Sequence, residues 1–184
     1  NLISKVPTII ASWERVRNSK EPIQPDPELS HASNFLYMLN GNRPDKEMER
    51  VFDVCLILHA DHTFNASTFA AREVASTRAH MYSAVSAAVG ALSGELHGGA
   101  NFEVMKMLLD IKDEKNVESW VREKIESGDR IMGMGHAVYK TVDPRSMVLK
   151  ELSKKLSKKI GLPWFDITRK IEETTAEIMK NRKE

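Results

Sequence analysis

The chain has 184 residues, and its 27 lysines and arginines against 26 aspartates and glutamates leave a formal net charge of +1. This balance gives no global attraction to nucleic acid or to a membrane surface. The single cysteine, Cys55, excludes an internal disulfide and a cysteine-based zinc site. No apolar run approaches the roughly 20 residues that cross a bilayer. Because no signal-peptide pattern opens the sequence, we expect a cytoplasmic protein.

Helices are the only regular elements that the sequence predicts. Residues 45–89 contain neither Gly nor Pro, the residues that usually interrupt regular structure. Apolar residues recur at three- and four-residue steps, and no stretch alternates with a period of two. The chain is therefore predicted to be all-α. In chain order, the predicted helices span residues 2–17, 30–39, 45–60, 67–92, 117–127, 144–160 and 166–180.

Three further features complete this prediction. A proline-containing linker occupies residues 19–28. Asn116 is predicted to cap the helix that follows it, and Asp143 to cap the helix that Pro144 begins. Another helix is expected just after residue 100, with one apolar face made of Phe102, Met105, Leu108 and Leu109.

The first candidate site is the pair His59 and His62. Three residues apart on a helix, they share a face. They form either a polar site at a helix end or a hydrogen-bonded pair without a function. A metal site would need a third ligand, and none is adjacent, so we predict no metal site.

The second candidate is His97, which two glycines follow. Glycines let backbone segments approach closely and relax the φ angles. A helix is predicted to start just after them, and the positive end of a helix favours a neutral imidazole. A neutral imidazole can donate a hydrogen bond to a developing enolate oxygen. The alternative is a glycine turn in which the histidine is incidental.

The third candidate combines His136 with Arg145. A planar guanidinium grips a carboxylate with two hydrogen bonds. Arg145 falls in a first helical turn, where an acidic residue is more usual. Lys140 lies between the two and is suited to a phosphate. The Gly-x-Gly of residues 133–135 is weak evidence for a phosphate loop by itself.

Together these segments resemble the citrate synthase family. The matching stretches are LHADH at 58–62 with NAST at 65–68, LHGGAN at 96–101, GMGHAVYK at 133–140 and DPR at 143–145. Each motif is modest evidence, but all occur in the family's order and at similar separations.

The resemblance implies an almost wholly helical homodimer whose subunits each have a large and a small domain. Residues 1–97 would belong to the large domain and residues 98–184 to the small one. The implied reaction is the condensation of acetyl-CoA with oxaloacetate and water to citrate and CoA, the entry step of the tricarboxylic acid cycle. Such an acyltransferase uses acetyl-CoA as a co-substrate and needs no cofactor, nucleic acid or membrane.

The family's roles carry over to matching positions of this chain. His62, His136 and Arg145 would bind oxaloacetate, with His136 polarising the carbonyl under attack. His97 would hold the thioester oxygen as the enol forms. The CoA site would be lined by Ile131, Met132, Gly133, Met134 and Gly135, with Lys140 near a phosphate.

The sequence departs from the family at several positions. The family's base is an Asp expected beyond Glu184, and the surroundings of Asp166 do not match it, so we expect an internal fragment without the base. Glu95, His80 and Ala137 replace a usual Pro, Asp and Arg. Two alternatives stay open: a 2-methylcitrate synthase that uses propionyl-CoA, and a non-catalytic helical binding module that holds a metal through His59 and His62.

Overall fold

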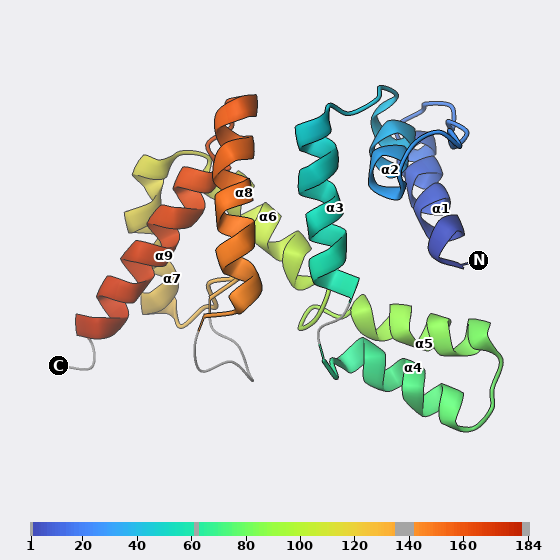
Figure 1. Ribbon diagram of the computed structural model, residues 1–184. Helices are drawn as coiled ribbons and strands as arrows, with labels where there is room; N and C mark the ends of the chain where they lie inside the picture. The colour runs from blue at the N-terminus through green and yellow to red at the C-terminus, as the bar shows by residue number, and fades with distance from the viewer. Residues whose placement is uncertain (1, 61–62, 135–141, 182–184) are drawn as a thin grey trace. The chain divides into compact units, whose positions relative to one another are not determined.

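The computed structural model describes residues 2–60, 63–134 and 142–181. Throughout these ranges the regular elements are helices, which confirms the predicted all-α fold (Figure 1). In chain order they are α1 (Leu2–Arg17), α2 (His31–Asn40), α3 (Lys46–Ala60), α4 (Ala66–Ser76), α5 (Met81–Leu92), α6 (Ala100–Ile111), the 3₁₀ turn η1 (Glu114–Asn116), α7 (Val117–Ser127), α8 (Pro144–Ile160) and α9 (Trp164–Asn181).

The chain divides into two compact units, Asn1–His62 and Thr63–Glu184. The first holds α1 to α3 and the second α4 to α9. The domain boundary that the family resemblance implies, after residue 97, lies downstream of this division and stays a prediction.

The first unit is a three-helix arrangement with well-defined helix ends. Ser30 caps α2 by accepting a hydrogen bond from the backbone N–H of Ser33. Gly41 ends α2 at φ 88°, a conformation that glycine adopts at little cost. The rings of Phe35 and Phe52 stack with centroids 5.1 Å apart and join α2 to α3. The predicted linker at 19–28 is non-helical, as expected.

The helix predicted over residues 67–92 is in fact two helices, and that prediction was wrong. α4 ends at Ser76, α5 begins at Met81, and the two pack side by side as a helical hairpin (Figure 1). Arg78 takes a left-handed φ of 60° in the turn between them. His80 then caps α5, because its Nδ1 accepts from the backbone N–H of Tyr82 at 3.3 Å. The turn uses no Gly or Pro, so the breaker pattern gave no signal for it.

The second unit has its core among α6, α7 and α9. Val117, Val121 and Ile167 are fully buried there. Burying such side chains contributes roughly 1.5–3 kcal/mol each. The remaining buried members of this cluster are Met107, Leu108, Ile111, Ile131 and Ile171.

Two details of the predicted α6–α7 region need correction. The inward face of α6 consists of Val104, Met107, Leu108 and Ile111, whereas Phe102, Met105 and Leu109 are exposed. A twelve-residue helix with apolar residues all round cannot be oriented from spacing alone. Asn116 does not cap α7 with its side chain; its Nδ2 donates to the carbonyl of Ile111 at 2.9 Å, at the end of α6.

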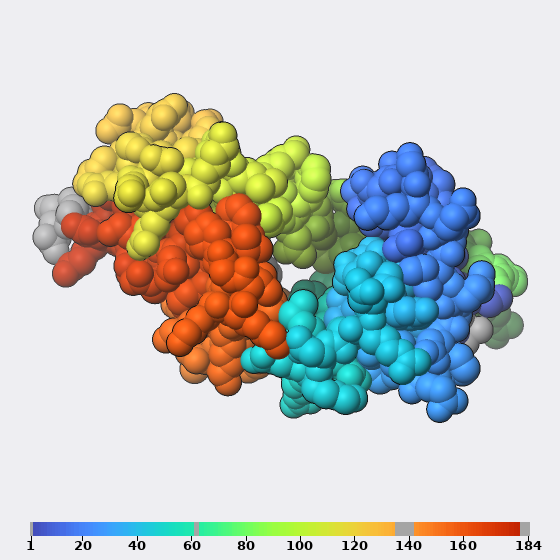
Figure 2. All heavy atoms as spheres, turned by 90° about the horizontal axis from the view of Figure 1, so that it is seen from above, coloured from blue at the N-terminus to red at the C-terminus, as the bar shows by residue number. Residues whose placement is uncertain are grey.

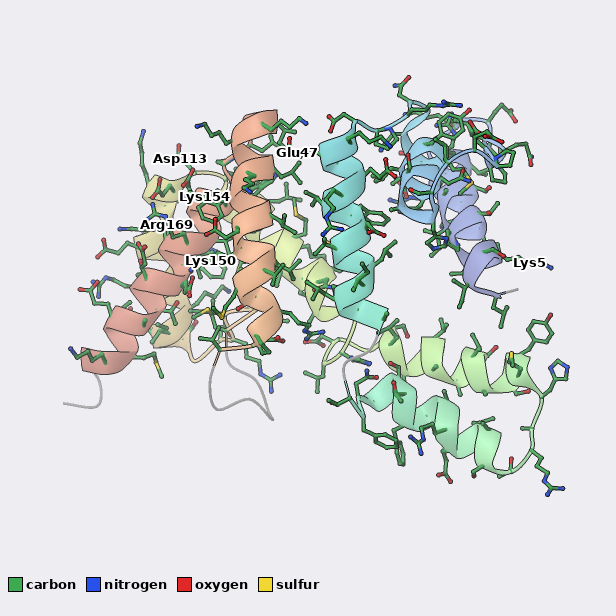
Figure 3. All side chains as sticks on the ribbon, in the orientation of Figure 1. Lys5, Glu47, Asp113, Lys150, Lys154 and Arg169 are labelled. Atoms are coloured by element: carbon green, nitrogen blue, oxygen red, sulfur yellow. The ribbon has the colours of Figure 1, made fainter. Side chains whose placement is uncertain are left out.

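Helices α8 and α9 pack against each other and are joined by an ion pair. Nζ of Lys150 lies 2.7 Å from a carboxylate oxygen of Glu172 (Lys150 is labelled in Figure 3). Helix α9 also packs against α7, and its red spheres lie beside the yellow ones when the molecule is seen from above (Figure 2). Asp143 caps α8 and Pro144 takes its first position, both as predicted.

Candidate active site

The turn between α5 and α6 carries His97 and is closed by short-range backbone hydrogen bonds. The N–H groups of His97 and Gly99 both donate to the carbonyl of Gly94, at 3.0 and 3.1 Å. Ala100 then donates to the carbonyl of His97 at 3.1 Å as α6 begins. The imidazole therefore projects from a tight turn whose backbone is fixed on both sides.

The glycines after His97 are required by close approach. A Cβ at Gly98 would lie 2.6 Å from the carbonyl oxygen of Leu92, and one at Gly99 would lie 2.8 Å from that of Gly94. Neither glycine is among those with positive φ. The prediction of close backbone approach is thus confirmed, while the predicted need for unusual φ angles is not met.

The ring of His97 contacts the first turn of α4. The backbone N–H of Ser67 donates to Nε2 at 3.3 Å, and the Ser67 hydroxyl lies 2.9 Å from the same nitrogen. A backbone N–H can only donate, so Nε2 acts as the acceptor and carries no proton. The imidazole is then neutral, with its one N–H at Nδ1.

The helix predicted just after the two glycines is α6, which begins at Ala100. The ring of His97 contacts a second helix that was not predicted to meet it, at the start of α4. Asn65 builds that start, because its Oδ1 accepts from the backbone N–H of Thr68 at 2.9 Å. The Ser67 hydroxyl lies 2.8 Å from this oxygen and 2.9 Å from Nε2 of His97, and its one hydrogen serves one of the two. The first turn of α4 therefore faces Nε2 of His97.

The contact that Ser67 makes with His97 was not predicted from the sequence. The neighbourhood of Ser67 did carry a signal, because Asn65 directly before a helical run is a typical N-cap. That signal predicts the start of α4. It does not predict a partner 30 residues away in the sequence.

Arg145 occupies the second position of α8 and forms an ion pair with Asp143. Nη2 of Arg145 donates to Oδ2 of Asp143 at 2.7 Å, and Nε donates to Oδ1 at 3.1 Å. The guanidinium therefore already holds one carboxylate in the two-pronged manner expected for oxaloacetate. Its predicted place in a first helical turn is confirmed.

The predicted CoA-lining residues from 131 to 134 serve partly as core. Ile131 is buried in the α6–α7–α9 cluster, and Met132 packs against it. Gly133 has φ 82°, and the N–H of Met134 donates to the carbonyl of Ile131 at 3.2 Å, closing a turn. Met134 is exposed. A ligand at this turn would meet backbone and Met134 rather than Ile131.

Four predicted site residues lie outside the described part of the chain: His62, Gly135, His136 and Lys140. Within the described part of the chain, His97 contacts the start of α4, and Arg145 forms an ion pair with Asp143. The predicted grouping of His62, His136 and Arg145 around one ligand stays a prediction.

Two other features bear on the alternatives. Nδ1 of His59 lies 2.6 Å from the carbonyl of Cys55 one turn earlier in α3, so this ring nitrogen donates within its own helix. Among the described residues, no three His, Cys, Asp or Glu side chains are placed to hold a metal ion.

No helix in the described part of the chain is long and apolar enough to cross a membrane. Asp166 is exposed in the first turn of α9.

An open hollow lies beside the His97 turn, at the start of α6. Its volume is about 420 Å³, and it is lined by Ser93, Glu95, Gly99, Phe102 and Glu103. Glu95, which departs from the family's usual Pro, therefore lines a surface concavity next to the catalytic candidate. Two carboxylates at one hollow make it unsuited to the negatively charged groups of oxaloacetate.

Comparison with known proteins connects this geometry to a family. The family model described as citrate synthase, C-terminal domain, matches residues 1–184. A citrate synthase of Synechocystis is 47% identical over 96% of this chain, and one of Haloferax volcanii is 43% identical over 96%.

Solved citrate synthase structures also match this chain. The ternary complex of a Thermoplasma acidophilum citrate synthase with carboxymethyl coenzyme A and oxaloacetate matches 98% of this chain, with a TM-score of 0.88 and 34% identity. The Pyrobaculum aerophilum enzyme matches 94% of it with a TM-score of 0.84. The chain spans about half the length of these proteins, 45% of the Synechocystis relative and 48% of the Thermoplasma chain. The chain belongs to the citrate synthase family.

Proposed function

We propose that this protein is an acyltransferase that condenses acetyl-CoA with oxaloacetate and water, giving citrate and CoA. Membership of the family supports the reaction type. The observation that carries the proposal is the contact between His97 and Ser67, because it leaves a neutral imidazole with a single N–H at Nδ1.

The chemistry needs such a donor. The α-proton of a thioester is a very weak acid, and its transfer to the carboxylate base expected beyond Glu184 places negative charge on the carbonyl oxygen. A preorganised donor aimed at that oxygen stabilises the charge as it develops. Nδ1–H of His97 is proposed to donate this hydrogen bond. A neutral donor held by a helix end needs no reorganisation at the moment of reaction.

The other roles belong to the same proposal. His62, His136 and Arg145 bind oxaloacetate, and His136 polarises its carbonyl. Residues 131–135 line the CoA site, and Lys140 lies near a CoA phosphate. The protein works as a cytoplasmic homodimer without a cofactor. The small residues of α5 allow another helix to approach closely, which supports the homodimer. The relative solved with carboxymethyl coenzyme A and oxaloacetate supports the choice of substrates.

A second candidate reaction uses propionyl-CoA. One relative, from Bacillus subtilis, is named citrate/2-methylcitrate synthase and is 44% identical over 87% of this chain. The extra methyl group of propionyl-CoA changes binding by only about 1–3 kcal/mol, so one scaffold serves both substrates.

One comparison tests the proposal and separates these reactions. The longer enzyme that contains this chain is assayed for release of free CoA thiol with oxaloacetate and either acetyl-CoA or propionyl-CoA. Controls omit oxaloacetate. We expect oxaloacetate-dependent release with kcat/KM higher for acetyl-CoA. Higher kcat/KM for propionyl-CoA would select the second candidate, and release that is independent of oxaloacetate would contradict both.

A further inference from the structure

Asp143 performs two tasks at the start of α8. Its Oδ1 accepts from the backbone N–H of Arg145 at 2.9 Å, which caps the helix. The same carboxylate binds the guanidinium of Arg145 through Nε at 3.1 and 3.2 Å and through Nη2 at 2.7 Å. The two side chains are only 26% and 27% exposed, so solvent screens this pair less than it screens a surface ion pair.

The ion pair between Asp143 and the Arg145 guanidinium is distinct from the N-cap that Asp143 makes with the Arg145 backbone N–H. Asp113 makes the same cap at η1, where its Oδ1 accepts from the backbone N–H of Lys115 at 2.9 Å. There the residue two positions on is a lysine, whose ammonium cannot form a two-pronged contact. The sequence Asp-x-Arg at α8 therefore adds an orienting contact that capping alone does not require.

This contact fixes the direction of the guanidinium. Asp143 engages the edge formed by Nε and Nη2. A guanidinium is planar, so holding one edge also fixes the plane and the direction of the edge formed by Nη1 and Nη2. A ligand that meets a pre-oriented side chain does not have to order it on binding.

We infer that Asp143 is the positioning residue for oxaloacetate: it holds the Arg145 guanidinium in the orientation that receives a substrate carboxylate. This inference rests on the proposed function. It assigns to Asp143 an effect on oxaloacetate affinity that a helix cap does not have, because a cap acts on the stability of α8 and not on the direction of a side chain.

The test is steady-state release of CoA thiol by the longer enzyme that contains this chain together with the expected base, and by its variants. Asp143→Asn and Asp143→Ser both keep a good N-cap, and both lose the charged two-pronged contact. Asp113→Asn is the matched control, since it removes the same charge from the same cap geometry. We expect both Asp143 variants to raise KM for oxaloacetate about tenfold, with KM for acetyl-CoA changed by less than about twofold. Their melting temperatures should match that of Asp113→Asn.

The outcomes separate the inference from the proposed function. An unchanged KM for oxaloacetate in both Asp143 variants overturns the inference. So does an equal rise in both KM values, which would mark general damage to α8. A lower KM for oxaloacetate would make Asp143 a competitor of the substrate and would also overturn it. A wild-type protein without oxaloacetate-dependent thiol release would instead contradict the proposed function itself.

Discussion

At the residue scale, the position and tautomer of the His97 ring depend on a contact with another helix. The imidazole is held from one side by the backbone N–H of Ser67, at the positive end of α4. From the other side it is fixed by the turn that Gly98 and Gly99 allow. Both contacts orient the imidazole and do not involve the reacting atoms. Substituting Ser67 or Gly98 should therefore change kcat even though His97 itself is not mutated.

The Ser67 hydroxyl offers a mild test of this arrangement. Ser67→Ala keeps the backbone N–H at Nε2 and removes only the hydroxyl. One hydrogen bond contributes about 1 kcal/mol, so we expect kcat to fall about fivefold with the fold intact. The check is kcat for thiol release together with the melting temperature. A loss as large as that of His97→Ala would mean that the hydroxyl, not the N–H, is the contact that matters.

Gly98 offers a sharper test, with Gly90 as its control. A Cβ at position 98 would lie 2.6 Å from the carbonyl oxygen of Leu92, whereas a Cβ at position 90 meets nothing within 4 Å. Gly98→Ala should destabilise the fold by about 1–3 kcal/mol and lower activity. Gly90→Ala, within α5, should stabilise it by about 0.5–1 kcal/mol. Urea unfolding of both variants checks this; equal midpoints would contradict the close packing of the His97 turn.

At the element scale, the α4–α5 hairpin shows what the sequence could and could not predict. The helical character of residues 67–92 was predictable from their composition and from the absence of breakers. The turn was not, because it relies on a left-handed Arg78 and on a cap from His80 instead of on Gly or Pro. By contrast, the ends of α2, α7 and α8 follow the standard Gly and Asp-Pro signals and were predicted within a residue or two.

The cap of α5 can be improved. His80 accepts the N–H of Tyr82 at a long 3.3 Å, and its ring stacks on the Tyr82 ring with centroids 4.9 Å apart. Asp is a much better N-cap, so His80→Asp should raise the free energy of unfolding by about 0.5 kcal/mol. His80→Ala serves as the comparison and should lower it. If His80→Asp is instead the less stable of the two, the stacking contributes more than the cap.

Asp26 makes the first unit sensitive to acid. Its carboxylate accepts from the backbone N–H of Glu28 and pairs with Arg43, and these contacts lower the pKa of Asp26 below its usual value. A lowered pKa stabilises the fold above the unfolded value of 3.8 and ceases to do so as pH falls through the folded value. The Asp26→Asn variant should therefore lose less stability than wild type between about pH 5 and pH 3. Denaturant midpoints at both pH values check this; parallel losses would contradict it.

At the scale of the whole molecule, local motifs predicted the family and long-range contacts completed the candidate site. The three histidine motifs are short, contiguous stretches, so they can be recognised in the sequence alone. The family model and the solved structures support the same family. The contact between His97 and Ser67 joins residues 30 positions apart, and no periodic pattern reports it. The inward face of α6 was likewise set by packing against α7 and α9, because apolar residues occur on all its sides.

The most direct test is the rate of oxaloacetate-dependent CoA thiol release by the longer enzyme that contains this chain together with the expected base, and by its His97→Ala variant. We expect turnover of about 1 s⁻¹ or more for wild type, as is usual for enzymes. For His97→Ala we expect a loss of roughly 10²–10³ in kcat, the cost of removing one preorganised donor from a developing oxyanion. The circular dichroism and melting temperature of the variant should stay unchanged. A variant that retains more than about a third of the wild-type rate would contradict the assignment of His97 as that donor.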